Sequence, residues 1–148
     1  MAAKSDNSSG GSYQLLQVNS LTLGISASEV LTVVEWSQPT PLPFAPESVL
    51  GVVSVLGRMY TVVDITKLLD KPINRTTGFI VTLSGDEQLA LAIDEAGEVI
   101  EVNQTEEESA SSLIRQRINF DGREISLLNT DMLFPEIIRG RERRRRGL

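Results

Sequence analysis

The carboxylates offer this chain its widest choice of chemistry. The 148 residues include no cysteine and no histidine, which excludes thiol chemistry, histidine acid–base catalysis and the usual zinc sites. An enzyme made from the remaining groups, such as a glycosidase, would have to use Asp64, Asp94 and Glu95. Aromatic residues make up only 5% of the chain, which is poor material for a sugar-binding cleft. We therefore predict a protein that is not an enzyme and holds neither cofactor nor metal.

Each prominent acid also has a structural explanation. Asp64 follows an apolar strand and stands where a helix N-cap belongs, so its carboxylate would accept from the first backbone N–H groups. Asp94 ends another apolar strand, and a turn-stabilising role is favoured there over partner recognition. The run Glu106 to Glu108 indicates a solvated surface, because adjacent side chains diverge too strongly to share a metal ion.

The charge of the chain is unevenly distributed. The net charge is −6, and residues 139–148 carry six Arg and one Glu, a balance of +5, which leaves −11 for residues 1–138. An acidic body is a poor partner for nucleic acid. The first twelve residues lack an apolar signal region, and no apolar run approaches the ~20 residues of a membrane span. The expected location is cytoplasmic.

Composition divides the chain into three parts. Residues 1–12 are mostly Ser, Gly, Asn and Ala and predict a flexible leader. Residues 13–138 contain the alternating apolar segments of a folded domain. Residues 139–148 predict a disordered, solvated Arg-rich tail. Its alternative roles are contact with nucleic acid, a membrane or an acidic protein surface.

The stretch 41–70 is the densest in structural signals. Its prolines favour an extended approach, and residues 47–50 predict one helical turn that ends at Gly51. Two strands, 51–56 and 59–63, flank Gly57-Arg58 as a hairpin with covered faces.

The rest of the chain reads as further short strands and hairpins, with no long amphipathic helix. A lone strand covers residues 30–36, another segment covers 94–102, and Asn129 is expected to cap a short helical turn. The lone Trp36 suits a barrel core and an interface equally well. The predicted hairpins pair 13–18 with 21–25, 79–83 with 89–93, and 118–120 with 124–128.

An internal echo suggests two similar β-lobes. Superimposing Gly57 on Gly122 also superimposes Arg58 on Arg123 and Asp64 on Asn129. Both segments then read as strand, Gly-Arg turn, strand and helix cap. An all-β fold of paired small barrels or a sandwich is the expected architecture.

The ordered set of motifs resembles the CheW-like coupling-protein family of bacterial chemosensory systems over residues 13–134. The family pattern G-V-[IV]-N-L-R-G followed by V-I-D-L reads here as Gly51-Val52-Val53-Ser54-Val55-Leu56-Gly57 and Val62-Val63-Asp64-Ile65. The later pattern V-D-x-V-x-x-V is seen in Ile93-Asp94-Glu95-Ala96-Gly97-Glu98-Val99-Ile100-Glu101-Val102. No single piece is diagnostic, but their order and spacing are a specific signal.

The resemblance implies two small SH3-like five-stranded β-barrels that share a core, with short helical turns. It implies a non-catalytic adaptor that binds the regulatory domain of a CheA-type histidine kinase and the cytoplasmic tip of a chemoreceptor, without membrane insertion. The receptor would lie between the barrels, near the third strand and the G-V-x-N-L-R-G loop. The partner-binding residues expected on this basis are Val30, Thr32, Val33, Ser54, Leu56, Gly57, Arg58 and Asp94.

Three departures from the family pattern fall on the receptor-facing side. Leu56 replaces the family Arg, Ser54 replaces its Asn, and Thr32 replaces a common acidic residue. Loss of a guanidinium removes bidentate contacts. The hypothesis is a divergent coupling protein with altered receptor specificity that serves pilus motility or another non-flagellar pathway.

The rival function is a small β-barrel binding module outside chemosensing, with the Arg-rich tail on nucleic acid or an acidic partner. Barrels of that kind carry aromatic and basic residues on their strands, and these strands carry few of either.

Overall fold

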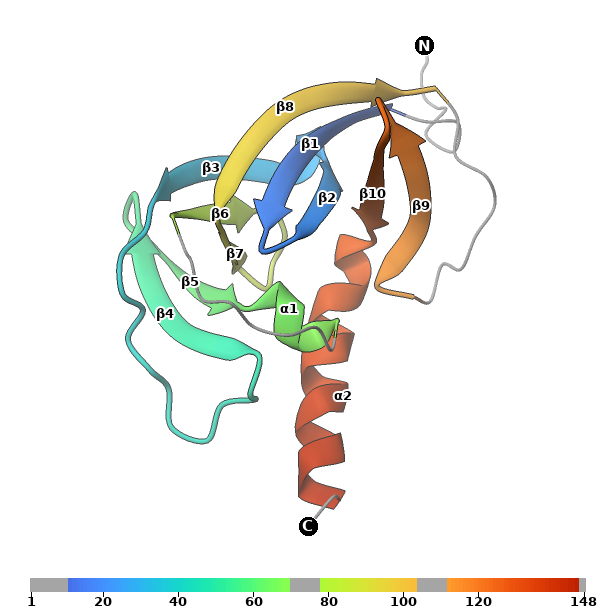
Figure 1. Ribbon diagram of the computed structural model, residues 1–148. Coiled ribbons are helices and arrows are strands. Elements are labelled where there is room, and N and C mark those ends of the chain that lie inside the picture. The colour runs from blue at the N-terminus through green and yellow to red at the C-terminus, as the bar shows by residue number, and fades with distance from the viewer. Residues whose placement is uncertain (1–10, 70–77, 104–111, 147–148) are drawn as a thin grey trace.

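The computed structural model describes residues 11–69, 78–103 and 112–146, with side chains as far as Arg139 (Figure 1). Residues 1–10 of the predicted leader and the run Glu106 to Glu108 lie outside these residues. None of the described helices is long and apolar enough to cross a membrane.

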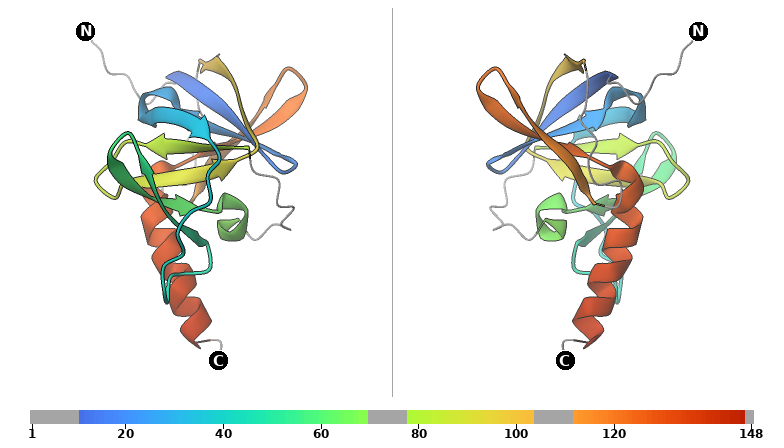
Figure 2. Two further views of the ribbon diagram at one scale, coloured as in Figure 1. Left: turned by 90° about the vertical axis from the view of Figure 1, so that its left-hand side faces the viewer. Right: turned by 90° about the vertical axis from the view of Figure 1, so that its right-hand side faces the viewer.

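In the described residues, ten strands form two curved five-stranded sheets that lie against each other (Figures 1 and 2). We call them barrel A and barrel B. The strands of barrel A, in spatial order, are β8 (Glu95–Val102), β1 (Gly11–Val18), β2 (Leu21–Ser26), β10 (Arg123–Leu128) and β9 (Ile114–Phe120). Those of barrel B are β3 (Val30–Glu35), β6 (Phe79–Leu83), β7 (Leu89–Ile93), β5 (Arg58–Val63) and β4 (Val49–Val55). The predicted pair of five-stranded barrels is confirmed.

The two barrels have the same topology and exchange one strand. In each, two antiparallel hairpins meet through a parallel pair, β2 with β10 and β5 with β7. Strand β3 follows β2 along the chain but pairs with β6 of barrel B, whereas β8 follows β7 but pairs with β1 of barrel A. Neither barrel is therefore a continuous segment of the chain, and neither is complete without the other.

Three apolar clusters fill the molecule. One fills each barrel, and the largest lies between them. Strand β7 shows how a strand serves two clusters: Leu89, Leu91 and Ile93 enter the shared core, while Ala90 and Ala92 enter barrel B. Since successive side chains point to opposite faces, a strand between two clusters is apolar throughout. The shared core thus accounts for the strands that lack polar alternation.

The β4–β5 hairpin turns one residue earlier than predicted, at Leu56-Gly57 instead of Gly57-Arg58. The turns are Leu56-Gly57, with φ of 51° and 83°, and Asp121-Gly122, with φ of 55° and 79°. Two consecutive positive φ values define the turn that suits the right-handed twist of hairpin strands. Arg58 consequently begins β5 instead of completing the turn. The internal echo persists, because both turns have the same geometry.

The predicted helical turn over residues 47–50 is wrong. The Val49 N–H donates to the Pro46 carbonyl oxygen at 3.0 Å in a single turn, and β4 begins at Val49. Gly51 lies within β4. Glycine is needed at this position because a Cβ there would come 2.4 Å from the Thr40 carbonyl oxygen. Thr40 and Val52 donate to each other's carbonyl oxygens at 2.9 Å, which brings the Pro-rich segment across the outer edge of β4.

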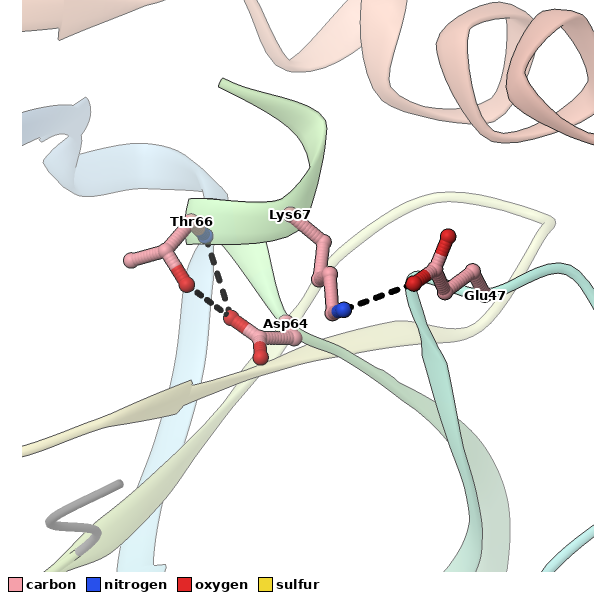
Figure 3. Close-up of polar contacts among 4 residues, drawn as sticks. All are labelled: Glu47, Asp64, Thr66 and Lys67. Carbon is pink, nitrogen blue, oxygen red and sulfur yellow. Dashed lines mark hydrogen bonds and ion pairs between the residues drawn. The ribbon is translucent and has the colours of Figure 1, made fainter. Parts of the chain in front are cut away.

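Helix α1 (Ile65–Leu68) begins as the sequence predicts (Figure 3). Asp64 Oδ1 accepts from the Thr66 N–H at 3.1 Å and from Thr66 Oγ1 at 2.5 Å. Lys67 Nζ lies 2.7 Å from Glu47 Oε2, so the helix is also tied to the turn before β4 (Figure 3). The N-cap role of Asp64 is confirmed.

The C-terminal segment differs most from prediction. After a 3₁₀ turn over Thr130–Met132, α2 (Leu133–Arg146) runs for 14 residues through the segment predicted as a disordered tail. Leu133 and Ile137 anchor it in the shared core, and Arg is a good helix former, so the helix continues past the barrels. Figure 2 shows its last turns projecting beyond the other drawn elements. The high charge of this segment predicts disorder, whereas the apolar anchor at Leu133 and Ile137 ties the start of the helix to the core.

Candidate functional site

The predicted partner-binding residues lie mainly at two places on barrel B. The first is β3, the last strand of its sheet. Val30 and Thr32 are half-buried, whereas Val33 and its neighbour Leu31 are exposed on the opposite face. The alternation follows from the period of two in a strand. Strand β3 thus presents apolar side chains outward, a feature suited to a protein partner.

The second place is the tip of the β4–β5 hairpin. Ser54, Gly57 and Arg58 are exposed there, and Leu56 is 84% exposed at a φ of 51°. A bulky residue with positive φ is rare and unfavourable by roughly 1–2 kcal/mol. Strained residues persist where function requires them. An apolar side chain held outward in a strained turn is the clearest functional signal on barrel B.

The matching turn of barrel A provides the control. Asp121 occupies the position of Leu56 with nearly the same φ, and Asp tolerates that backbone because its short polar side chain bonds locally. Both turns are exposed. The two turns have nearly the same geometry, with a favourable residue in barrel A and an unfavourable one in barrel B, so the backbone of the turn does not by itself favour Leu56.

Asp94 lies elsewhere, at the junction where the chain passes from β7 to β8. Its Oδ2 accepts from the Asn19 N–H at 2.9 Å, and its own N–H donates to the Gln17 carbonyl oxygen at 2.8 Å. These bonds connect the segment between β7 and β8 to the β1–β2 turn. The geometry matches the turn-stabilising role that the sequence favours for this residue.

Two further large apolar residues are exposed. Met59 stands beside the hairpin tip, and Phe44, which no sequence argument singled out, is 90% exposed at a φ of 62° in the Pro-rich loop. The spacing of Leu31 with Val33 could have revealed the outward face of β3, whereas no local signal marks Phe44. Trp36, equally suited to core or interface by sequence, is half-buried and packs against the core of barrel B.

The arrangement of the described residues favours binding over acid–base chemistry. Asp64 bonds within its helix cap and Asp94 within a chain junction, while Glu95 is exposed at the start of β8. Within the described ranges, no group of three His, Cys, Asp or Glu side chains could hold a metal ion. The distinctive surfaces of barrel B are apolar instead.

Comparisons with known proteins agree with this architecture. The family model described as CheW-like domain matches residues 12–137. The chemotaxis protein CheW of Bacillus subtilis (strain 168) is 31% identical over 99 residues, which span 65% of this chain and 64% of that relative, just under two thirds of its length. The crystal structure of the scaffolding protein TtCheW from Thermoanaerobacter tengcongensis superimposes with a TM-score of 0.71 at 17% identity. That match covers 80% of this chain and 88% of the other, and supports the fold.

Proposed function

The chain belongs to the CheW-like domain family, and from this premise we propose that it is a non-catalytic adaptor of a bacterial chemosensory two-component pathway. It couples a CheA-type histidine kinase to a chemoreceptor. The observation that carries the proposal is the family match over residues 12–137, which include every strand but the first residue of β1. The name of the Bacillus subtilis relative, a chemotaxis protein, points the same way.

The two surfaces of barrel B are the proposed contact sites. Leu56 and Met59 at the hairpin tip are large, exposed and apolar, the type of side chain that carries binding energy when a partner covers it. The outward face of β3, with Leu31 and Val33, supplies a second apolar surface. An adaptor needs two surfaces because it must hold two partners at once.

The hairpin tip also supports a difference in receptor specificity. Leu56 offers no hydrogen bond donor where the family pattern has Arg, and Arg58 begins β5 two residues later. An apolar tip discriminates against a receptor whose polar groups it would leave unpaired. We expect the cognate receptor to present an apolar surface to Leu56.

Capture experiments test the coupling function. The purified chain is immobilised and offered CheA-type regulatory domains and receptor tips from the same genome, each alone and then together. Capture of a kinase domain and a receptor tip in one complex supports the proposal. Capture of neither leaves the family fold intact but overturns the coupling function.

A matched pair of variants tests the assigned surface. Leu56→Arg should weaken capture of the cognate receptor about tenfold or more, because it places a charge where an apolar contact forms. Leu42→Arg introduces the same charge at another exposed leucine, in the Pro-rich loop, and should leave capture unchanged. Equal losses in both variants would show that charge alone matters and that the hairpin tip is not the contact.

A further inference from the structure

Helix α2 has two apolar stripes, and only one of them is buried. Leu133 and Ile137 enter the shared core. Phe134 and Ile138, each one residue further on, remain 45% and 38% exposed. Residues four apart lie on the same side of a helix, so this second pair forms a stripe of its own. Within the described residues, Phe134 and Ile138 are thus the large apolar side chains of α2 that remain exposed.

The end of α2 is strongly basic and lies beyond the matched family region. The family model ends at residue 137, whereas the helix continues to Arg146. Residues 139–146 include six Arg and one Glu. The helix carries this charge away from the acidic body, as its projection in Figures 1 and 2 shows. A negative surface outside its own barrels would complement this positive end.

A surface of that kind lies at the base of the same helix. A groove of about 260 Å³ is lined by three acidic residues, Glu29, Glu87 and Asp131, together with Phe134. No lysine or arginine is among the described residues that line it. Glu29 Oε1 accepts from Thr130 Oγ1 at 2.5 Å, which holds one carboxylate at the groove. The exposed apolar stripe thus begins at an acidic groove and leads to a basic helix end.

We propose that α2 docks against α2 of a second copy of this chain in an antiparallel pair. A twofold axis at Ile138 would place Ile138 against its counterpart, and residue 131 of one copy opposite residue 145 of the other. Each basic end would then reach the acidic groove of the other copy. The contact is isologous, so every favourable charge pairing occurs twice. The apolar stripes would cover each other at the centre.

A second copy fits this surface better than a phosphate-rich partner. A membrane or nucleic acid could neutralise the arginines, but the acidic groove and the −11 body would be repelled by phosphates. A partner of that kind would also leave the groove without a cation. The second copy satisfies both ends and the apolar stripe in one arrangement.

The dimer is expected to be weak and sensitive to salt. A 14-residue helix is roughly 21 Å long, so the contact is smaller than a standard protein interface. Dissociation constants on the order of micromolar suit small transient contacts. Charge pairing between the basic end of one copy and the acidic groove of the other would be reduced by added salt, which screens charges at a protein surface.

Cysteine cross-linking tests the register, because the chain has no cysteine of its own. In the full-length Ile138→Cys variant the two thiols would face each other across the twofold axis, and a mild oxidant should join them. The control is Leu56→Cys, an exposed leucine on barrel B. We expect the disulfide-linked dimer to form about tenfold faster in I138C, since pairing raises the local thiol concentration. Equal rates in the two variants would overturn the proposal.

A charge test separates the acidic groove from a general helix contact. Adding E87Q and D131N to I138C should slow cross-linking severalfold and reduce its dependence on salt. The control adds E124Q, an exposed acid on β10 of barrel A, and should cross-link as I138C does. Unchanged rates with the groove neutralised would overturn the pairing.

Sedimentation of the unmodified chain measures its oligomeric state and distinguishes a second copy from a membrane or nucleic acid as the partner of α2. Dimers at micromolar concentration that dissociate in salt support the proposal. A monomer that binds polyanionic RNA or anionic vesicles, or dimers that survive Ile138→Arg, would overturn it. Neither readout involves kinase or receptor, so failure here and failure of the adaptor function are distinguishable.

Discussion

Barrel A and barrel B are built from the same order of strands, yet they use the same positions differently. Both have a two-residue turn with paired positive φ values and a helix that begins directly after the parallel strand. Barrel A places Asp121 at its turn and extends into the long helix α2. Barrel B places Leu56 at its turn and ends in the short α1. The same turn geometry therefore carries a favourable residue in barrel A and an unfavourable one in barrel B, which is the difference that the predictions below test.

The interiors of the two barrels show a compensating difference. In barrel A, Leu127 lies opposite Gly24 across the parallel pair, and in barrel B, Val62 lies opposite Ala90. In barrel A a large leucine faces a glycine, which has no side chain, whereas in barrel B a valine faces an alanine. The same space is filled in two ways, as expected when close packing limits total volume and not residue identity.

The largest expected effect comes from the core that both barrels share. Leu91→Ala removes a fully buried side chain of β7 and should lower the free energy of unfolding by about 2–5 kcal/mol. Because the barrels exchange strands, both should unfold in a single transition. Denaturation followed by Trp36 fluorescence, which reports barrel B, and by circular dichroism, which reports all strands, should give one midpoint.

The exposed Leu42→Ala is the control for this variant and should change stability little. If the Trp36 fluorescence change were complete at a denaturant concentration where half of the circular dichroism signal persisted, the two barrels would unfold separately.

The next effect tests the difference between the interiors. A Cβ at Gly24 would lie 2.8 Å from Leu127 Cδ2, so Gly24→Ala should destabilise the protein by about 1–3 kcal/mol. Adding Leu127→Val recreates the Ala–Val pair of barrel B and should recover part of that loss. Thermal unfolding of both single variants and the double variant measures the coupling between the two sites. If the stability changes of the two single variants simply added up in the double variant, the side-chain sizes at positions 24 and 127 would not compensate each other.

A smaller effect is expected at the helix that ends barrel B. Asp64→Ala removes the acceptor for both Thr66 groups and should cost about 1 kcal/mol, the usual effect of losing an N-cap. Asp64→Asn keeps an acceptor oxygen and should retain most of the stability. Urea unfolding of the two variants distinguishes them, and equal losses would argue that charge, not capping, stabilises α1.

The smallest effect exchanges the turn residues. Leu56→Asp gives barrel B the turn of barrel A and should raise stability by about 1 kcal/mol, because Asp relieves the unfavourable backbone. Asp121→Leu should lower it by a similar amount. Chemical denaturation checks both, and capture of the partners should weaken only in L56D. If L56D were less stable than the unmodified chain, Leu56 would be a folding residue.

Short-range chemistry determined much of this protein from sequence alone. The hairpins, the Asp64 cap and the repeated Gly-containing turn follow from neighbouring residues, because turns and caps close within a few residues. Asn129 occupies the expected N-cap position but makes no side-chain capping bond there, so this part of the repeat is wrong. The order and spacing of the motifs between Gly51 and Val102 also sufficed to indicate the family. The expected residues of β3 and of the β4–β5 hairpin do lie on the surface of barrel B, although their role in binding stays a prediction.

Tertiary structure decided what depends on distant partners. The exchange of β3 and β8 is set by which hairpin each strand meets in space, and a strand's own residues do not name its neighbour. Helix α2 continues through the arginines because Leu133 and Ile137 anchor it in the shared core, and tertiary packing is what supplies most helix stability in proteins. Exposure of Leu56 and Phe134 follows from the same packing, since burial belongs to the whole fold and not to any one segment.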